Sequence, residues 1–267
     1  MTAPANPGHA PAVRLRGVGA GYDGRVVLAA MDLDVPAGSL LAVFGPNGGG
    51  KSTFLKLVAG LLRQMAGTIE VLGEPPGRQS RRIAYVPQAE LVDWSFPVTV
   101  GDVAMMGRYA LLGPIRAPGK RDHAVVRAAL ERVGMAALAG TRIEQLSGGQ
   151  RRRAFLARAI ASEPELFLLD EPVTGVDVPT QQDLMALLAE EAAAGRTVVA
   201  TTHDLAAVAR DFRTAVAING RILATGAASI VSDPAVLDAT YGGHLVVVGD
   251  RAVILDDAHH HDSPSGR

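Results

Sequence analysis

The chain has 267 residues with 26 basic and 27 acidic side chains, and its net charge of −1 argues against broad nucleic-acid binding, which needs a basic surplus. It contains no cysteine, which excludes disulfides, thiolate metal sites and cysteine nucleophiles. With 48% hydrophobic residues it can build a full core, so we expect one folded unit over residues 13–255 between disordered tails at 1–12 and 256–267. No segment reaches the ~18 uninterrupted apolar residues of a membrane span, and the first tail lacks the apolar region of a signal peptide.

Short apolar runs alternate with helical stretches along the folded unit. Leu40–Phe44 is an apolar run, and a glycine-rich turn separates it from a helical pattern over Lys51–Leu62. Glu165–Leu169 and Thr197–Thr201 read as two more buried strands, and Pro179 to Ala194 reads as a helix between them. Strands separated by helices predict parallel pairing and an α/β fold.

The middle of the chain and its last third have different patterns. From about residue 89 to 162 the periodicity is helical with few strand-like runs, so we expect a helical subdomain inserted in the α/β core. Two β-hairpins are expected after residue 210. They are Ala215–Ile218 with Arg221–Ala224, joined by Asn219-Gly220, and Leu245–Val248 with Ala252–Leu255.

The glycine-rich turn after Leu40–Phe44 fits the pattern G-x-x-x-x-G-K-[ST], between a predicted strand and a predicted helix. Its glycines allow backbone N–H groups to converge on a polyphosphate, and the N-terminus of the helix adds partial positive charge. Lys51 is expected to reach the β- and γ-phosphates, and the Ser52 hydroxyl to hold Mg²⁺. The expected nucleotide-binding residues are Gly45, Pro46, Asn47, Gly48, Gly49, Gly50, Lys51, Ser52 and Thr53.

Two carboxylates follow the apolar run that ends at Leu169. Ligands bind at the carboxyl ends of parallel strands, so Asp170 is expected in the Mg²⁺ shell and Glu171 beside the attacking water. Taken alone, the two carboxylates would fit a solvated strand end better. Together with the phosphate loop they predict Mg²⁺-dependent hydrolysis of a nucleoside triphosphate.

A second glycine-rich turn, Leu146–Gln150, opens another helical run and so predicts a second anion site, which is best explained if it serves a different chain. The pentapeptide resembles the ABC-transporter signature, and residues 13–243 resemble an ABC ATPase subunit. Four further matches stand in the family's order. They are Tyr22 for the aromatic that stacks on adenine, Gln88 for the Q-loop, Asp177 for the D-loop and His203 for the switch histidine.

The resemblance implies a P-loop NTPase (RecA-like) core of the ABC ATPase type, with an inserted helical subdomain and an antiparallel β edge. It also implies a homodimer that holds two ATP molecules head to tail. Glu171, His203 and Gln88 would act in catalysis, and Ser52, Gln88 and Asp170 would hold Mg²⁺. The partner subunit would close the site over the γ-phosphate with its Ser147, Gly148, Gly149, Gln150 and Asp177.

One ATPase unit without a membrane span looks like the detached subunit of an importer, at the cytoplasmic face of the membrane and without a nucleic-acid partner. The stretch from Val92 to Val100, with Gly107-Arg108 and Tyr241–Gly243, is similar to ATPases of manganese, zinc and iron importers. Those work with an integral permease and an extracytoplasmic metal-binding protein. We expect the stretch after Gln88 to face the permease, although it would equally serve as a small core of the helical subdomain.

Alternatives remain for the cargo and for the last residues. A siderophore or another solute would fit the same ATPase, and a non-transport ABC ATPase is a further alternative. His259–His261 follow Asp256-Asp257, so the end of the chain would either bind metal or be solvated and disordered.

Overall fold

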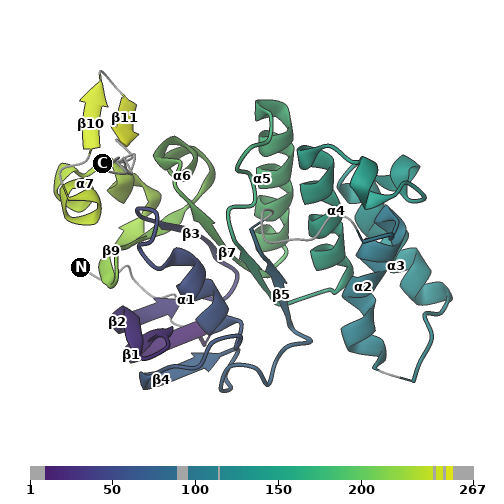
Figure 1. The fold of residues 1–267 in the computed structure, drawn as a ribbon, viewed down its shortest axis with the longest axis horizontal. Helices are drawn as coiled ribbons and strands as arrows, with labels where there is room; N and C mark the ends of the chain where they lie inside the picture. Colours follow the sequence, from purple (N-terminus) through teal and green to yellow (C-terminus); the bar gives the residue numbers. More distant parts are fainter. Residues whose placement is uncertain (1–9, 89–95, 114, 243–244, 249–250, 255–267) are drawn as a thin grey trace, which may run out of the picture.

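The computed structural model describes residues 10–88, 96–113, 115–242, 245–248 and 251–254. A six-stranded sheet runs through the centre of the molecule, in the order β5-β6-β7-β3-β8-β9 (Figure 1). Its first five strands are parallel, and β9 pairs antiparallel with β8 at one edge. The strands are β3 Leu40–Phe44, β5 Ile83–Val86, β6 Leu166–Leu169, β7 Thr197–Thr202, β8 Thr214–Ile218 and β9 Ile222–Ala227.

The central strands are continuous apolar runs because both faces of the sheet are covered. Leu41 and Val43 of β3 pack on one face with α1, whereas Leu40, Ala42 and Phe44 pack on the other face with α5 and α6. The helices are α1 Lys51–Val58, α5 Val178–Ala193, α6 Leu205–Asp211 and α7 Pro234–Tyr241. The predicted α/β class and parallel pairing are therefore confirmed.

A three-stranded antiparallel sheet, which the apolar runs did not indicate, covers α1. It consists of β1 Val13–Tyr22, β2 Arg25–Val35 and β4 Ala66–Val71, in the order β2-β1-β4. Register shifts interrupt β1 between Leu15 and Val18 and twice more before Tyr22, so the alternation of apolar and polar residues is broken there. Its buried side chains share one core cluster with α1 and the adjacent face of the central sheet.

The helical subdomain lies to the right in Figure 1. Its helices α2 Val100–Leu112, α3 Lys120–Arg132 and α4 Gly148–Ala161 pack on one another, as the sequence predicted for residues 89–162, of which 89–95 lie outside the described residues. The backbones of α2 and α4 touch at Gly107, where an added Cβ would lie 2.2 Å from the carbonyl oxygen of Arg158. Buried Arg108 then ties α2 to Asp122 of α3 and to Glu163 after α4.

Most predicted boundaries agree with the structure within a few residues. Helix α1 ends at Val58 and not at Leu62, since Gly60 takes a positive φ of 74° after it. Both predicted hairpins form, and the second consists of β10 Leu245–Val248 and β11 Arg251–Ile254. Within the described part of the chain, three short 3₁₀ helices lie at Ala136–Leu138, Ile143–Gln145 and Ala228–Ser232. Among the helices of the described residues, none is both long and apolar enough to cross a bilayer.

An ion cluster joins the helical subdomain to α5. The side chain of Glu191 is 1% exposed and accepts hydrogen bonds from Arg132 of α3 and from Arg196 in the turn before β7. A buried carboxylate is stable only when it is paired in this way. Glu191 therefore holds the two parts of the molecule together at this point.

We expect Glu191→Ala to lower the free energy of unfolding by about 2 kcal/mol, measured by urea denaturation at pH 7. The substitution removes the shared partner of two arginines, but both arginines are about one-third exposed and regain water. The matched control is Glu190→Ala, which removes a 68% exposed side chain 3.3 Å from Arg132 and should cost below ~0.5 kcal/mol. Equal losses in the two variants would contradict the role given to Glu191.

Candidate active site

The phosphate loop connects the end of β3 to the start of α1. At two of its positions the backbone conformation and the close neighbours exclude any residue except glycine. Gly45 has φ 156°, and an added Cβ would lie 1.9 Å from the carbonyl oxygen of Ile218. Gly50 has φ 96°, and an added Cβ would lie 2.5 Å from Leu28 Cδ2 of β2. Gly50 also caps α1 without any side chain, so the first N–H groups of the helix keep their capacity to bind an anion.

Lys51, the first residue of α1, is 7% exposed. Its Nζ donates to the carbonyl oxygens of Gly45 at 2.9 Å and Pro46 at 3.0 Å, so its ammonium lies within the loop that it follows. Burial lowers the pKa of Lys51, whereas the negative charges of Glu171 and Asp170 act in the opposite direction. The loop thus presents a desolvated cation next to two carboxylates.

A cavity of about 420 Å³ opens beside the loop, a volume within the usual range for small-ligand sites. It brings together residues from the phosphate loop, from the segment after β5, from the end of β6 and from the end of β7. The lining residues are Val27, Asn47, Gly48, Gly50, Lys51, Ser52, Thr53, Gln88, Glu171 and His203. Sequence positions more than 150 residues apart, from Asn47 to His203, therefore meet at one site.

Asp170 has one carboxylate oxygen bound and one free for a ligand. The residue is 2% exposed, and its Oδ1 accepts a hydrogen bond of 2.7 Å from Thr201 Oγ1. Its Oδ2 is buried with no hydrogen-bond partner among the residues that the structure describes. A hard divalent cation prefers such an oxygen, and Ser52 and Gln88 line the adjacent cavity. These three residues fit a Mg²⁺ site.

Glu171 has a constrained backbone and a carboxylate held by two neighbours. Its φ of 50° is unusual for a residue with a side chain, and its N–H donates to Thr201 Oγ1 at 2.9 Å. Its Oε2 accepts a 3.0 Å hydrogen bond from Thr174 Oγ1 and lies 3.4 Å from His203 Nδ1. The carboxylate is thereby held at the rim of the cavity.

Thr201 positions both carboxylates and was missed in the sequence. One hydroxyl group donates to Asp170 and accepts from the Glu171 N–H, which links the ends of β6 and β7. Thr201 is 0% exposed and directly follows the apolar residues Val198 to Ala200 of β7. The available signal was a hydroxyl side chain next to the end of a buried strand and two residues before His203.

The contact between His203 and Glu171 shifts both pKa values. The hydrogen bond to Glu171 raises the pKa of His203, and the same bond lowers the pKa of Glu171. Protonated His203 contributes to the stability of the fold at low pH, and this contribution is lost as pH rises through the raised pKa of His203. Ionised Glu171 also contributes to the stability of the fold, and that contribution is lost as pH falls through the lowered pKa of Glu171. The ion pair is complete between these two values.

We expect the imidazole of His203 to titrate above its ordinary pKa of about 6.5 in the nucleotide-free protein, because the Glu171 carboxylate stabilises the imidazolium. In Glu171→Gln its midpoint should return toward that ordinary value. NMR titration checks this, with the resonance assigned by its loss in His203→Gln. The same midpoint with and without the carboxylate would contradict the pairing.

Tyr22 does not line the cavity. It lies at the end of β1 with 41% of its surface exposed, and Lys56 Nζ of α1 lies 5.9 Å from its ring centroid. The ring is available for stacking on the side of α1 that faces the antiparallel sheet. Its contact with adenine stays a prediction.

The second glycine-rich turn forms the N-terminus of α4. Ser147 Oγ accepts a hydrogen bond from the N–H of Gln150, and Gln150 Oε1 accepts from the N–H of Ser147, so the turn is a complete capping box. An added Cβ on Gly149 would lie 3.9 Å from Oδ1 of Asp177, the N-cap of α5. Ser147, Gly148, Gly149, Gln150 and Asp177 thus cluster together, and none of them lines the cavity beside Lys51.

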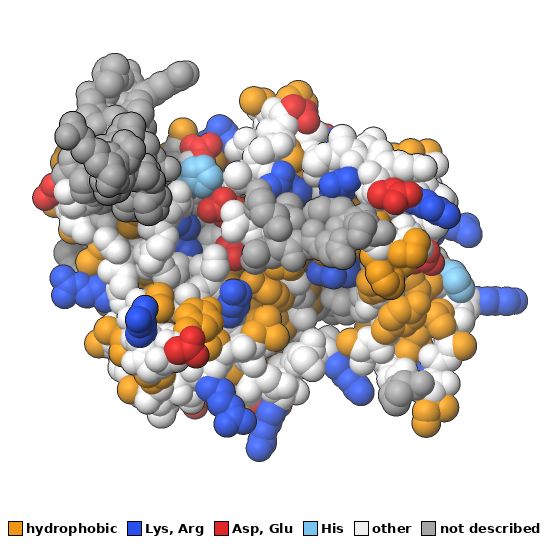
Figure 2. Space-filling view, viewed as in Figure 1, with side chains coloured by type: hydrophobic (Ala, Val, Ile, Leu, Met, Phe, Trp, Pro, Cys, Tyr) orange, Lys and Arg blue, Asp and Glu red, His pale blue; other side chains and the backbone are white. Residues whose placement is uncertain are grey.

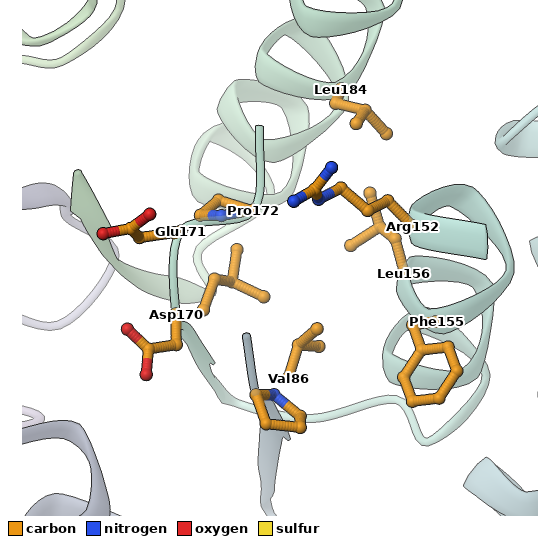
Figure 3. Close-up of a pocket in the computed structure, with 10 residues that line it drawn as sticks. Val86, Arg152, Phe155, Leu156, Asp170, Glu171, Pro172 and Leu184 are labelled. Atoms are coloured by element: carbon orange, nitrogen blue, oxygen red, sulfur yellow. The ribbon is translucent and has the colours of Figure 1, made fainter. Parts of the chain in front are cut away.

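A second cavity, of about 30 Å³, lies on the other side of the β6 end. Figure 3 shows the side chains of Val86, Phe155 and Leu156 around it, while the carboxylates of Asp170 and Glu171 point away from it. Its volume holds about one water molecule. Both Asp170 and Glu171 line this small cavity, and Glu171 also lines the cavity beside the phosphate loop.

Comparisons with known proteins agree with this arrangement. The sequence pattern of the ABC transporter family matches residues 28–174, which include the phosphate loop and Glu171. The zinc transport system ATP-binding protein TroB of Treponema pallidum is 43% identical over 224 residues, 84% of each chain. The manganese transport system ATP-binding protein MntB of Bacillus subtilis is 40% identical over 92% of this chain and 98% of that protein.

A solved structure of an ABC transporter has a fold similar to that of this chain. It is an inward-facing conformation of an ABC transporter assigned to the metal-chelate type, with a TM-score of 0.77 and 31% identity over 87% of this chain and 89% of that one. The P-loop core, the inserted helical subdomain and the antiparallel edge predicted from the sequence are the architecture found here. The chain therefore belongs to the ABC transporter family, as one of its ATP-hydrolysing subunits.

Proposed function

We propose that this chain powers the import of a divalent metal ion, manganese or zinc and after them iron, by hydrolysing ATP beneath a membrane permease. ATP hydrolysis is supported above all by the position of Lys51, Glu171 and His203 around one cavity. Metal transport is supported by relatives of 40% and 43% identity that are named for manganese and zinc transport. The chain covers most of the length of both relatives, so the proposal concerns the whole subunit.

The site residues divide the chemistry among them. Lys51 and the loop N–H groups bind the phosphates of ATP, and Ser52, Gln88 and Asp170 hold Mg²⁺, which neutralises phosphate charge when bound. Glu171 orients the attacking water and attracts a proton of that water. The lowered pKa of Glu171 keeps its carboxylate ionised at neutral pH, as this role requires. His203, fixed by Glu171, presents its imidazole to the γ-phosphate.

The active form in this proposal is a homodimer with ATP at the interface. The signature residues Ser147 to Gln150 lie at an exposed helix N-terminus and outside the cavity of their own chain, which supports their use by a second copy. In that arrangement Ser147 and Gly149 of the partner subunit contact the γ-phosphate. ATP then acts as a dimerising ligand, and its hydrolysis releases the dimer.

The helical subdomain offers the surface for the permease. Figure 2 shows hydrophobic side chains gathered over α2 and α3, on the side of the molecule that carries the subdomain. Phe96 and Tyr109 are 60% and 51% exposed, and a groove of about 690 Å³ runs between the two helices past Met105. The segment Leu91–Ser95, which holds the single Trp of the chain, lies outside the described residues.

The subunit would sit at the cytoplasmic face of the membrane, and an extracytoplasmic binding protein would deliver metal to the permease from the other side. Residues 13–255 would form the single ATPase unit. Residues 1–9 and 255–267, with His259–His261, lie outside the described residues. Residues 10–12 of the expected first tail are described, and Ala12 is 2% exposed and donates its N–H to the carbonyl oxygen of Val35 at 2.8 Å. Metal binding by the C-terminal end predicts that deleting residues 256–267 changes the inhibition of ATPase activity by metal.

Metal content of whole cells tests the cargo. Cells lacking this protein are grown with manganese, zinc or iron limiting, and each metal is measured. We expect a deficit in one metal, restored by the wild type and not by Glu171→Gln. The absence of any deficit, together with normal ATPase activity of the purified subunit, would favour a chelated or unrelated solute. Co-purification of a permease from solubilised membranes separates transport from a non-transport ABC ATPase.

A further inference from the structure

The turn between β8 and β9 contacts the backbone of the phosphate loop. The N–H of Gly220 donates to the carbonyl oxygen of Gly49 at 2.9 Å. The carbonyl of Ile218 lies so close to the loop that an added Cβ on Gly45 would meet it at 1.9 Å. Gly220 is also bound on its other side, because its carbonyl accepts from the N–H of Ala29 in β2 at 2.8 Å. The loop backbone therefore rests on this turn.

The side chain of Asn219 connects the same turn to the C-terminal helix. Asn219 is exposed, yet its Nδ2 donates to the carbonyl oxygen of Thr240 at 3.0 Å. Thr240 is 0% exposed near the end of α7, and its Oγ1 donates to the carbonyl oxygen of Val236 at 2.6 Å. Helix α7 is capped at both ends, by the Asp233 side chain and by Gly242 in the left-handed conformation. One hydrogen bond thus joins a fixed helix to the turn.

We propose that Asn219 is a positioning residue for nucleotide binding, which couples helix α7 through the Gly220–Gly49 contact to the phosphate loop. The inference rests on the proposed nucleotide site. A loop binds phosphate well only if its N–H groups already converge, since ordering them on binding costs affinity. Without the hydrogen bond from Asn219 to Thr240, the turn between β8 and β9 is held less firmly. The phosphate loop that contacts this turn then has to be ordered by the nucleotide. The effect falls on ground-state binding and leaves the chemical step unchanged.

The test compares Asn219→Asp and Asn219→Ala with the wild type. Aspartate favours turns as asparagine does but has no donor for the Thr240 carbonyl, so it separates this hydrogen bond from the turn itself. Arg221→Ala is the matched control, since it replaces another exposed side chain of the same hairpin. MgADP affinity is measured by calorimetry, ATPase kinetics give KM and kcat, and urea denaturation gives stability.

We expect the Kd for MgADP and the KM for ATP to rise about threefold to tenfold in both Asn219 variants, the range for one hydrogen bond, with kcat within twofold. Arg221→Ala should match the wild type. Unchanged Kd and KM in the Asn219 variants would overturn the proposal, whether or not their stability falls. Failure of the wild type to bind MgADP would instead overturn the nucleotide site, so the two failures are distinguishable.

Discussion

Lys51→Ala should lower the affinity for MgATP by about 10²–10³-fold, and ATPase activity should be lost with it. The buried ammonium of Lys51 makes charge-assisted hydrogen bonds, each of which contributes about 1.5–3 kcal/mol. Its present acceptors, the carbonyls of Gly45 and Pro46, belong to the phosphate loop itself, so the substitution removes both a phosphate ligand and an internal tie of the loop. Calorimetric titration with MgATP measures the effect.

Lys120→Ala is the matched control, because Lys120 is an exposed lysine at the start of α3 and outside the cavity. Its affinity for MgATP should equal that of the wild type. Circular dichroism and urea denaturation establish that Lys51→Ala is folded. Nucleotide binding of wild-type strength by a folded Lys51→Ala variant would show that the cavity beside the phosphate loop is not the nucleotide site.

Glu171→Gln should reduce kcat for ATP hydrolysis by about 10²–10⁴-fold while MgATP still binds. Glutamine keeps the size of the side chain and can still accept the Thr174 hydrogen bond, but it has no charge to attract the proton of the attacking water. Because the γ-phosphate then persists, the variant should accumulate as a dimer in MgATP. Single-turnover kinetics and light scattering after gel filtration measure the two effects.

The control for this variant is Glu165→Gln, which lies immediately before β6, at the opposite end of that strand from Glu171. The Glu165 carboxylate is 56% exposed and pairs with Arg82, away from the cavity. The Glu165→Gln variant should hydrolyse ATP at the wild-type rate. A Glu171→Gln variant that remains monomeric at saturating MgATP would contradict the shared site, and one that hydrolyses ATP normally would contradict the role of Glu171.

The sequence by itself determined the features that depend on neighbours a few residues apart. The strand Leu40–Phe44, the glycine turn after it and the start of α1 at Lys51 appear in the structure as predicted, because glycine backbone freedom and helix initiation are local. The Asn219-Gly220 hairpin has the same local origin. The capping box of Ser147 with Gln150 likewise lies within one helical turn, so a helix beginning at the second glycine turn could be predicted.

Only the tertiary structure decided the features that depend on residues far apart in the chain. Thr201 binds both Asp170 and Glu171 because β6 and β7 pair in one register, which no pattern within either strand specifies. The family resemblance implied an antiparallel edge, but no apolar run located the strands of the sheet over α1, because the bulges of β1 break its period and its stability comes from packing on distant residues. The contact of Gly220 with Gly49 likewise requires β3 and β8 to be adjacent, since a hydrogen bond acts over about 3 Å and its partners are chosen by the packing of the whole fold.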